Sequence, residues 1–234
     1  RWATHGAPSE RNAHPHVSDG LAVVHNGIIE NHEPIRERLR GLGYAFHSDT
    51  DTEVVAHLVA LHLRSAADLL EAVVRAAGEL QGAFALAFVA QSAPGHVVVA
   101  RKGAPLLLGL GEGEQFAASD ASALVGATRR VIYLEDGDCA ELQPEGCRIV
   151  DAAGVEAKRA VHESQLSAEA VELGPWQHYM QKEIFEQPGA LAATLEIVAG
   201  ARSLQAGLRS WGETQTPHSL GYVEQLYTFA DRER

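Results

Sequence analysis

The segment Val24–His32 holds the residues whose possible chemistry is easiest to recognise in this chain. A short apolar strand, Leu21–Val24, is expected to lead into Asn26 and Gly27, and a polar turn with a histidine follows. Asparagine offers a side-chain amide donor, and glycine lets backbone N–H groups approach a ligand because it has no Cβ. Two such donors suit the negative oxygen that develops when an amide carbonyl is attacked. The same pair also forms ordinary hairpin turns, so the pattern taken alone favours a simple turn.

A free amino acid needs a partner for each of its charged groups, and two other polar motifs offer such partners. The chain starts with Arg-Trp-Ala-Thr-His-Gly-Ala-Pro-Ser, continues with Asn-Ala-His-Pro-His at 12–16, and has Ser-Asp-Thr-Asp-Thr-Glu at 48–53. Arg1 can hold an α-carboxylate by two parallel hydrogen bonds, and Asp51 can hold an α-ammonium. Taken alone, each has a simpler interpretation. Arg1 would be a solvated terminal charge, and Asp51 would be a helix N-terminal residue favoured by the macrodipole.

The motifs together resemble a known family. With the segment His-Tyr-Met-Gln-Lys-Glu-Ile-Phe-Glu-Gln-Pro at 178–188, they resemble the glutaminase half of the isomerizing glutamine–fructose-6-phosphate aminotransferase family, over roughly residues 1–208. The first three motifs are typical of class II glutamine amidotransferases in general, and the 178–188 segment is typical of this one branch. The resemblance implies that the Asn26 side chain and the Gly27 N–H form an oxyanion hole, under a lid over residues 1–9. The positions it places around glutamine are Arg1, Trp2, Thr4, His5, His14, Gly27 and Asp51.

The nucleophile is the part of this machinery that the sequence does not supply. In class II amidotransferases an N-terminal cysteine attacks the amide, and its own α-amine acts as the base. Residue 1 is Arg here, and the resemblance places that cysteine several dozen residues upstream. Cys139, at an apolar strand position, and Cys147, beside a Glu-Gly turn, are expected to be structural. We therefore expect an N-terminally truncated glutaminase domain that binds glutamine and is inactive because the cysteine nucleophile is missing.

Three other interpretations stay open. Phosphoribosyl-pyrophosphate amidotransferases and asparagine synthetases share the Asn-Gly pair but lack the 182–188 segment. A non-catalytic module that binds glutamine would use the same clamp. A histidine metal site at His14-Pro15-His16 is disfavoured because a proline separates the imidazoles and no Cys or Asp accompanies them, so no metal or cofactor is expected. Local hydrogen bonds are the expected role of four other histidines, which are His16, His25, His32 and His47.

Composition limits the expected partners and compartment. The 234 residues carry a formal net charge of -12, which argues against nucleic acid and anionic membranes as partners. No apolar run approaches the ~20 residues of a membrane-spanning helix, and no signal peptide is recognised. Two cysteines make no disulfide framework, so a reducing, cytoplasmic location is expected. The expected partners are L-glutamine and, through an absent isomerase domain, fructose 6-phosphate; the resemblance implies a homodimeric parent.

Three helices are expected to come before the strands that fill the middle of the chain. Asn31 can cap the first, whose apolar face would include Ile35, Leu39 and Leu42. The Thr50-x-x-Glu53 run has capping-box form and is expected to open the second. The third is expected over 65–80.

A run of strands at hairpin spacing follows these helices. The expected strands cover 83–90, 97–100, 105–110, 115–118, 130–134, 138–142 and 148–150, with a short helix over 119–125. Shorter strands are expected at 21–24 and 44–47, and residues 1–20 are expected to be loop. Helices followed by antiparallel strands indicate an α+β fold. The resemblance implies an N-terminal-nucleophile-hydrolase-type four-layer αββα sandwich, incomplete at its N-terminus.

The chain is expected to divide into three parts. Residues 1–156 would form the glutaminase domain, without its first strands. Residues 157–208 would form an extended arm and a linker helix, with a helical segment over 176–195, leading toward an absent isomerase domain. Residues 209–234 form a tail without clear periodicity, where the family resemblance fades, and are expected to be disordered.

Overall fold

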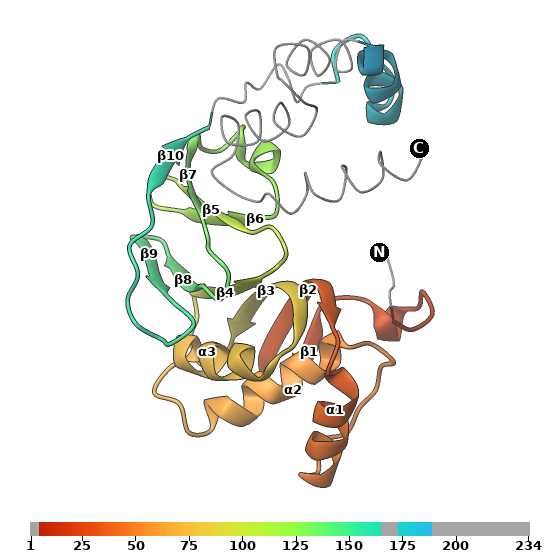
Figure 1. The fold of residues 1–234 in the computed structure, drawn as a ribbon, viewed down its shortest axis with the longest axis vertical. Coiled ribbons are helices and arrows are strands. Elements are labelled where there is room, and N and C mark those ends of the chain that lie inside the picture. The colour runs from red at the N-terminus through yellow and green to blue at the C-terminus, as the bar shows by residue number, and fades with distance from the viewer. Residues whose placement is uncertain (1–4, 165–172, 189–234) are drawn as a thin grey trace, which may run out of the picture. The chain divides into compact units, whose positions relative to one another are not determined.

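The computed structural model describes residues 5–164 and 173–188 of the chain. The chain divides into two compact units, the first over Arg1–Val171 and the second over Glu172–Arg234. The first unit contains two antiparallel sheets and three α-helices (Figure 1). In the second unit residues 179–188 are helical, inside the range where the sequence predicts a helix. Among the described helices, none is both long and apolar enough to cross a membrane.

The larger sheet has six strands in the order β1-β2-β3-β4-β8-β9. Its longest antiparallel pair joins β2 and β3, from Leu21 opposite Ala90 to Ile29 opposite Gly82. Its strands are β1 (His16–Ser18), β2 (Leu21–Ile29), β3 (Gly82–Ala90), β4 (Val97–Lys102), β8 (Cys139–Gln143) and β9 (Gly146–Val150).

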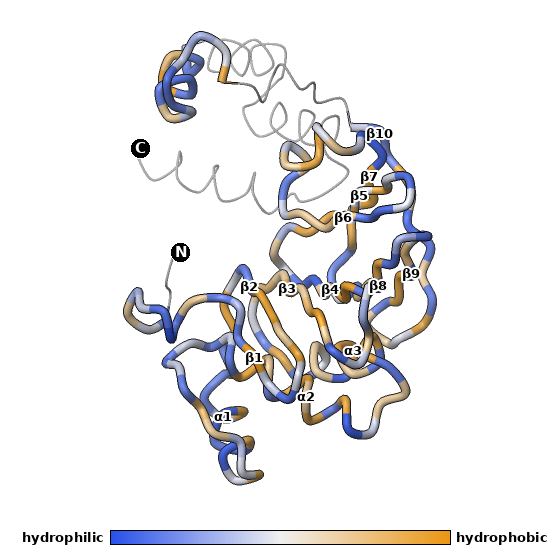
Figure 2. The backbone as a smooth tube through the Cα atoms, turned by 180° about the vertical axis from the view of Figure 1, so that it is seen from behind, coloured by the Kyte–Doolittle hydropathy of each residue, from blue (hydrophilic) through white to orange (hydrophobic). Residues whose placement is uncertain are grey.

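Three helices cover one face of this larger sheet (Figure 1). They are α1 (His32–Gly41), α2 (Thr52–Leu63) and α3 (Leu69–Glu79). α2 contacts α1, α3, β1 and β2, which explains why its residues are buried from Thr52 through Ala60. α1 lies at the margin of this layer and is largely hydrophilic, whereas β2 and β3 are largely hydrophobic (Figure 2).

The apolar core follows the two-residue alternation of the strands. Along β3, Phe84, Leu86 and Phe88 face the helices, whereas Ala85 faces the smaller sheet. This is the pattern expected of a strand that is covered on both faces. The strand predicted over 83–90 is thereby confirmed as β3.

The smaller sheet has four strands in the order β10-β7-β5-β6. They are β10 (Val161–Glu163), β7 (Arg130–Tyr133), β5 (Leu107–Leu110) and β6 (Gln115–Ala118). Leu108 and Ile132 pack toward the larger sheet, and Leu107 and Val131 form a second cluster with Leu124 of the short 3-10 helix η2 (Ala121–Leu124). The described residues therefore supply three of the four expected layers, namely helices, sheet and sheet.

The strand at Asn26 and Gly27 differs from the expectation. The sequence predicts a strand that ends at Val24, whereas β2 continues to Ile29 without a turn. Gly27 explains the difference: it lies opposite Phe84 with φ +130°, and a Cβ there would lie 2.1 Å from the carbonyl oxygen of Ala83. The glycine lets the two strands approach closely, which is a strand role rather than a turn role.

Several element boundaries also differ from the predictions. The expected strand over 44–47 is irregular, and Leu42 lies beyond α1 and is 57% exposed. α3 begins at Leu69 rather than at 65, because Asp68 caps it by accepting a hydrogen bond from the Glu71 N–H.

Three short elements were not predicted. Residues 1–20, expected to be loop, contain β1 and the 3-10 helix η1 (Glu10–Asn12). The expected extended arm over 157–208 contains β10, which pairs with β7. The rest of that arm, apart from 173–188, and the tail over 209–234 lie outside the described residues.

Candidate functional site

Asp51 is the centre of the candidate site. It lies directly before α2, is 1% exposed, and accepts a hydrogen bond at Oδ2 from the Ile29 N–H at 2.9 Å. Its side chain makes no capping bond to α2, so the simpler interpretation as a helix cap does not account for its orientation. The carboxylate instead points toward the end of β2, two residues beyond Gly27.

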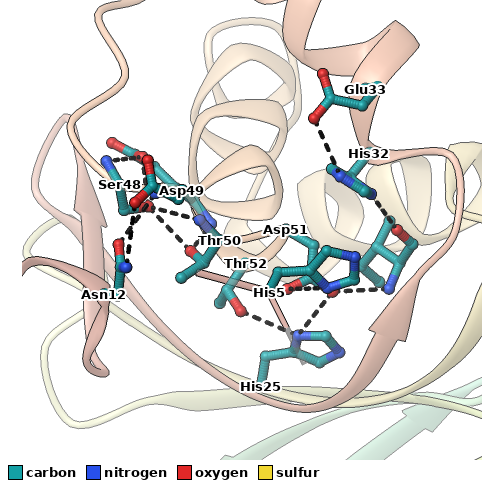
Figure 3. A network of polar contacts seen from close by, with 12 residues as sticks. His5, Asn12, His25, His32, Glu33, Ser48, Asp49, Thr50, Asp51 and Thr52 are labelled. Carbon is teal, nitrogen blue, oxygen red and sulfur yellow. Dashed lines mark hydrogen bonds and ion pairs between the residues drawn. The ribbon is translucent and has the colours of Figure 1, made fainter. Parts of the chain in front are cut away.

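Three histidines gather around this carboxylate (Figure 3). His5 Nδ1 lies 3.8 Å from Asp51 Oδ1, and His25 Nδ1 lies 3.9 Å from Oδ2. The Nδ1 of His25 is also 3.1 Å from Thr52 Oγ1. His32 donates from Nδ1 to the Ile29 carbonyl at 2.8 Å, and its ring lies 4.7 Å from that of His5. The site thus combines a buried carboxylate with imidazoles from three separate segments.

Asn26 and Gly27 both lie on β2, the strand that carries His25 and ends at Ile29. By strand alternation Asn26 lies on the opposite face of β2 from His25 and Gly27. Its side chain is exposed and makes no hydrogen bond to the residues that the structure describes. A rise of about 3.4 Å per residue puts Gly27 roughly 7 Å from Ile29, whose N–H holds Asp51. That separation is comparable to the length of an extended amino acid such as glutamine.

The segment before Asp51 is held by a buried carboxylate, Glu53. Its two oxygens accept hydrogen bonds from the backbone N–H groups of His47 and Ser48, both at 2.7 Å, and Ser48 Oγ donates at 2.6 Å. His57 Nε2 lies 3.7 Å from the same carboxylate. Burial alone would raise the pKa of Glu53, but these hydrogen bonds and His57 outweigh it and lower that pKa to about 2. Glu53 is therefore a fixed anion around which the segment folds.

Arg36 of α1 holds the same segment through its carbonyl groups. Its guanidinium is buried and donates to the carbonyls of Ser48 at 3.1 Å and Thr50 at 2.6 Å. Thr50 Oγ1 also lies 3.0 Å from His16 Nε2. The segment that leads to Asp51 is thus held at its N–H groups by Glu53 and at its carbonyl groups by Arg36.

The structure places the remaining predicted site residues as follows. The ring of His14 lies 6.0 Å from that of His16, and so next to the histidine that contacts Thr50. No group of three or more potential metal-ligating residues occurs among the described residues. The predicted residues Arg1, Trp2 and Thr4 lie outside the described residues.

Both cysteines lie away from this arrangement, on β8 and β9. Burial, helped by the neighbouring Asp138 carboxylate, raises the pKa of Cys139 to about 12. Burial also raises the pKa of Cys147. Neither thiol has the lowered pKa of an activated nucleophile, in agreement with the structural role expected for both.

Sequence reasoning missed Asn12, Arg36 and the network around Glu53. The capping box predicted at Thr50 and Glu53 is half present, because the Glu53 N–H lies 3.4 Å from Thr50 Oγ1. The Glu53 side chain, however, turns to His47 and Ser48. The burial of these polar side chains is the signal that marks them as residues that hold the site. Burial cannot be read from these residue types in the sequence, because they are usually exposed.

Comparisons with known proteins point the same way as this geometry. A family model described as a glutamine amidotransferase domain matches residues 3–126. The chain is 57% identical over 208 residues to the isomerizing glutamine–fructose-6-phosphate aminotransferase of Xanthomonas campestris, covering 89% of this chain and 34% of that protein. The same enzyme of Haemophilus influenzae is 55% identical over 196 residues, covering 84% and 32%. The chain therefore spans about a third of the length of these curated relatives.

Comparison with solved structures shows which fold the chain has. The glutamine phosphoribosylpyrophosphate amidotransferase from B. subtilis superposes with a TM-score of 0.54 at 26% identity, covering 62% of this chain and 33% of that one. A structure described as the allosteric regulatory enzyme of purine biosynthesis gives 0.51 at 28% identity, covering 61% and 31%. These likenesses confirm the expected fold class, the N-terminal-nucleophile-hydrolase type with antiparallel sheets.

Proposed function

The chain belongs to the glutamine amidotransferase domain family, and on that premise we propose that it binds L-glutamine between Asp51 and the Asn26-Gly27 pair. The observation that carries this proposal is the buried Asp51 carboxylate, held by a backbone N–H of the same strand that carries Asn26 and Gly27.

Asp51 is suited to an α-ammonium group. A carboxylate can accept about four hydrogen bonds, and Asp51 accepts one from Ile29 while His5 and His25 stay at 3.8 and 3.9 Å. Those distances exceed a hydrogen bond. The buried charge thus keeps acceptor capacity for a ligand cation, and His5 would line the same space. The predicted clamp of the α-carboxylate by Arg1 stays part of this proposal, as do Trp2 and Thr4 as residues that line the glutamine site.

The side-chain amide would then reach Asn26 and Gly27. Attack on its carbonyl carbon moves negative charge onto the oxygen, which the Asn26 amide and the Gly27 N–H would stabilise. Ammonia leaves, and hydrolysis of the resulting acyl-enzyme releases L-glutamate. The resemblance assigns the attack to an N-terminal cysteine thiol, and neither Cys139 nor Cys147 has the properties for it.

Binding of glutamine to the chain tests the proposal by calorimetry. We expect saturable binding of L-glutamine, weakened at least about tenfold in Asp51→Asn, because a charge-assisted hydrogen bond is lost. Asp120→Asn is the matched control, since Asp120 caps η2 on the smaller sheet through the Ser122 N–H. A wild-type chain without glutamine affinity, or an Asp51→Asn chain of unchanged affinity, would refute the proposal.

The acceptor of ammonia is proposed from the curated relatives. The chain would supply ammonia to fructose 6-phosphate, bound by a separate isomerase domain, to form glucosamine 6-phosphate. The identity of 53–57% to enzymes of that name supports this choice over the phosphoribosylpyrophosphate type, at 26%. Glucosamine 6-phosphate formation by the gene product that carries this chain, given both substrates, is the test; phosphoribosylamine formation from phosphoribosylpyrophosphate instead would favour the other type.

The setting of this reaction is also a proposal. We propose a cytoplasmic enzyme that is a homodimer when complete, without nucleic acid or membrane partners. The net charge of -12 supports the absence of nucleic acid, and two unpaired cysteines support a reducing compartment. Light scattering on the gene product measures the oligomeric state.

A further inference from the structure

One buried side chain, Asn12, joins the segment that carries His5 to the segment that carries Asp51. It lies at the end of η1 and is 1% exposed. Its Nδ2 donates to the Ala7 carbonyl at 2.9 Å and to Asp49 Oδ2 at 3.3 Å, and its Oδ1 accepts from the Asp49 N–H at 3.0 Å. Both ends of one amide are thus used, and the bonds span 37 residues of sequence.

The backbone next to His5, at Gly6, packs closely against the Asn12 amide. Gly6 has φ +78°, and a Cβ there would lie 2.6 Å from Asn12 Nδ2 and 3.2 Å from Asp49 Cβ. Such contact is possible only for glycine. Because His5 directly precedes Gly6, its ring position depends on the Asn12–Asp49 contact.

The hydrogen bonds of Asn12 also reach the segment that carries Asp51. Asn12 holds the Asp49 N–H, while Arg36 holds the neighbouring carbonyls of Ser48 and Thr50. The Arg11–Asp49 ion pair joins the same two segments. Its side chains are 60% and 51% exposed, however, and exposed pairs contribute little. The buried amide is therefore the stronger of the two connections.

We propose that Asn12 is a positioning residue for glutamine: it sets His5 and Asp51 relative to each other and so shapes the site for the α-ammonium group. This inference rests on the proposed function. Asn12 touches neither group itself and acts through Gly6 and Asp49. Its loss would loosen two segments at once and leave the rest of the fold in place.

The variant Asn12→Ala tests this, with Asn31→Ala as its matched control. Asn31 also bridges distant segments with both ends of its amide, donating to the Glu79 carbonyl at 2.8 Å and accepting from the Gln81 N–H at 2.9 Å. We expect the glutamine dissociation constant to rise about tenfold or more in Asn12→Ala and to stay within about twofold in Asn31→Ala. Should Asn12→Ala not fold, Asn12→Asp carries the same expectation, because it keeps the acceptor and removes the donor to Ala7.

Amide hydrogen exchange separates positioning from general destabilisation. Positioning predicts faster exchange at 5–9 and 48–51 in Asn12→Ala, with exchange in α2 and β3 unchanged. Unchanged affinity in Asn12→Ala, equal losses in both variants, or faster exchange across the whole unit would overturn the inference. A wild-type chain that binds no glutamine would instead overturn the proposed function, and this inference with it.

Discussion

Replacement of Glu53 by glutamine should destabilise the fold and make its stability less dependent on pH. The folded protein lowers the pKa of Glu53 from 4.5 to about 2, through His57, Ser48 and the His47 N–H. That lowering corresponds to roughly 3 kcal/mol of stabilisation of the charged form at neutral pH. The substituted side chain carries no charge, and its NH₂ group would face donors instead of acceptors. We therefore expect Glu53→Gln to lose roughly 3 kcal/mol at pH 7, or about 6–12 °C in Tm.

The sign of the pH dependence follows from the lowered pKa. The stabilisation is fully present above the unfolded pKa of 4.5 and is lost as pH falls toward the folded pKa of about 2. At pH 3.5 the wild-type chain should already have lost about 1.4 kcal/mol of it. The difference between wild type and Glu53→Gln should therefore be constant from pH 7 to pH 5.5 and then narrow.

Urea unfolding followed by circular dichroism at pH 7, 5.5 and 3.5 measures this difference directly. Glu71→Gln is a suitable control. Its exposed carboxylate pairs with Arg75 and accepts a hydrogen bond from the Ala67 N–H, and a glutamine there can still accept that bond, so the substitution should cost little. A loss below about 0.5 kcal/mol at pH 7 would refute the account of Glu53, since this is what ordinary surface changes produce. So would a difference that stays the same at all three pH values.

Further expectations concern the strand, the buried arginine and the thiols. Gly27→Ala should destabilise by about 3 kcal/mol or more in urea unfolding, because its Cβ would meet the Ala83 carbonyl; a near-neutral result would contradict the β2–β3 geometry. Arg36→Met should raise the glutamine dissociation constant several-fold, measured by calorimetry, because the carbonyls of Ser48 and Thr50 lose their donor. An unchanged affinity would mean that the segment before Asp51 keeps its conformation without Arg36. A thiol reagent at pH 8 should label Cys147 faster than the 1%-exposed Cys139, and both equally in urea; fast labelling of both in native protein would contradict the burial.

The core elements could be predicted from the sequence because their periodicity is local. The apolar run at β3 and the hairpin-spaced strands from β4 to β9 required only alternation and turn spacing. β1 and β10 were missed because they are three residues long and are formed by pairing with β2 and β7. Short strands of this kind depend on a partner far away in sequence, which no local pattern reveals.

The candidate site was proposed from a different kind of signal. Asp51 and the Asn26-Gly27 pair were identified through the family motif and through chemistry that a free amino acid requires. Their orientation could not be predicted, because the sequence around Asp51 is typical of a helix cap. Asp51 accepts a hydrogen bond from the Ile29 N–H only because β2 continues past Gly27. The interpretation of Gly27 as a turn failed for the same reason.

Residues that hold a site are harder to read from sequence than residues that form it, and this chain shows why. Asn12, Arg36 and Glu53 are polar types that are usually exposed, yet each is at most 6% exposed here. Each satisfies backbone groups of the segment 47–51, an irregular stretch in which Ser48, Thr50 and Asp51 are buried. Buried backbone groups outside regular structure need partners, and here side chains supply several of them. It follows that three side chains that need never touch glutamine hold the segment that carries Asp51. Loss of any of them should weaken glutamine binding, and loss of the Glu53 charge should destabilise the fold as well.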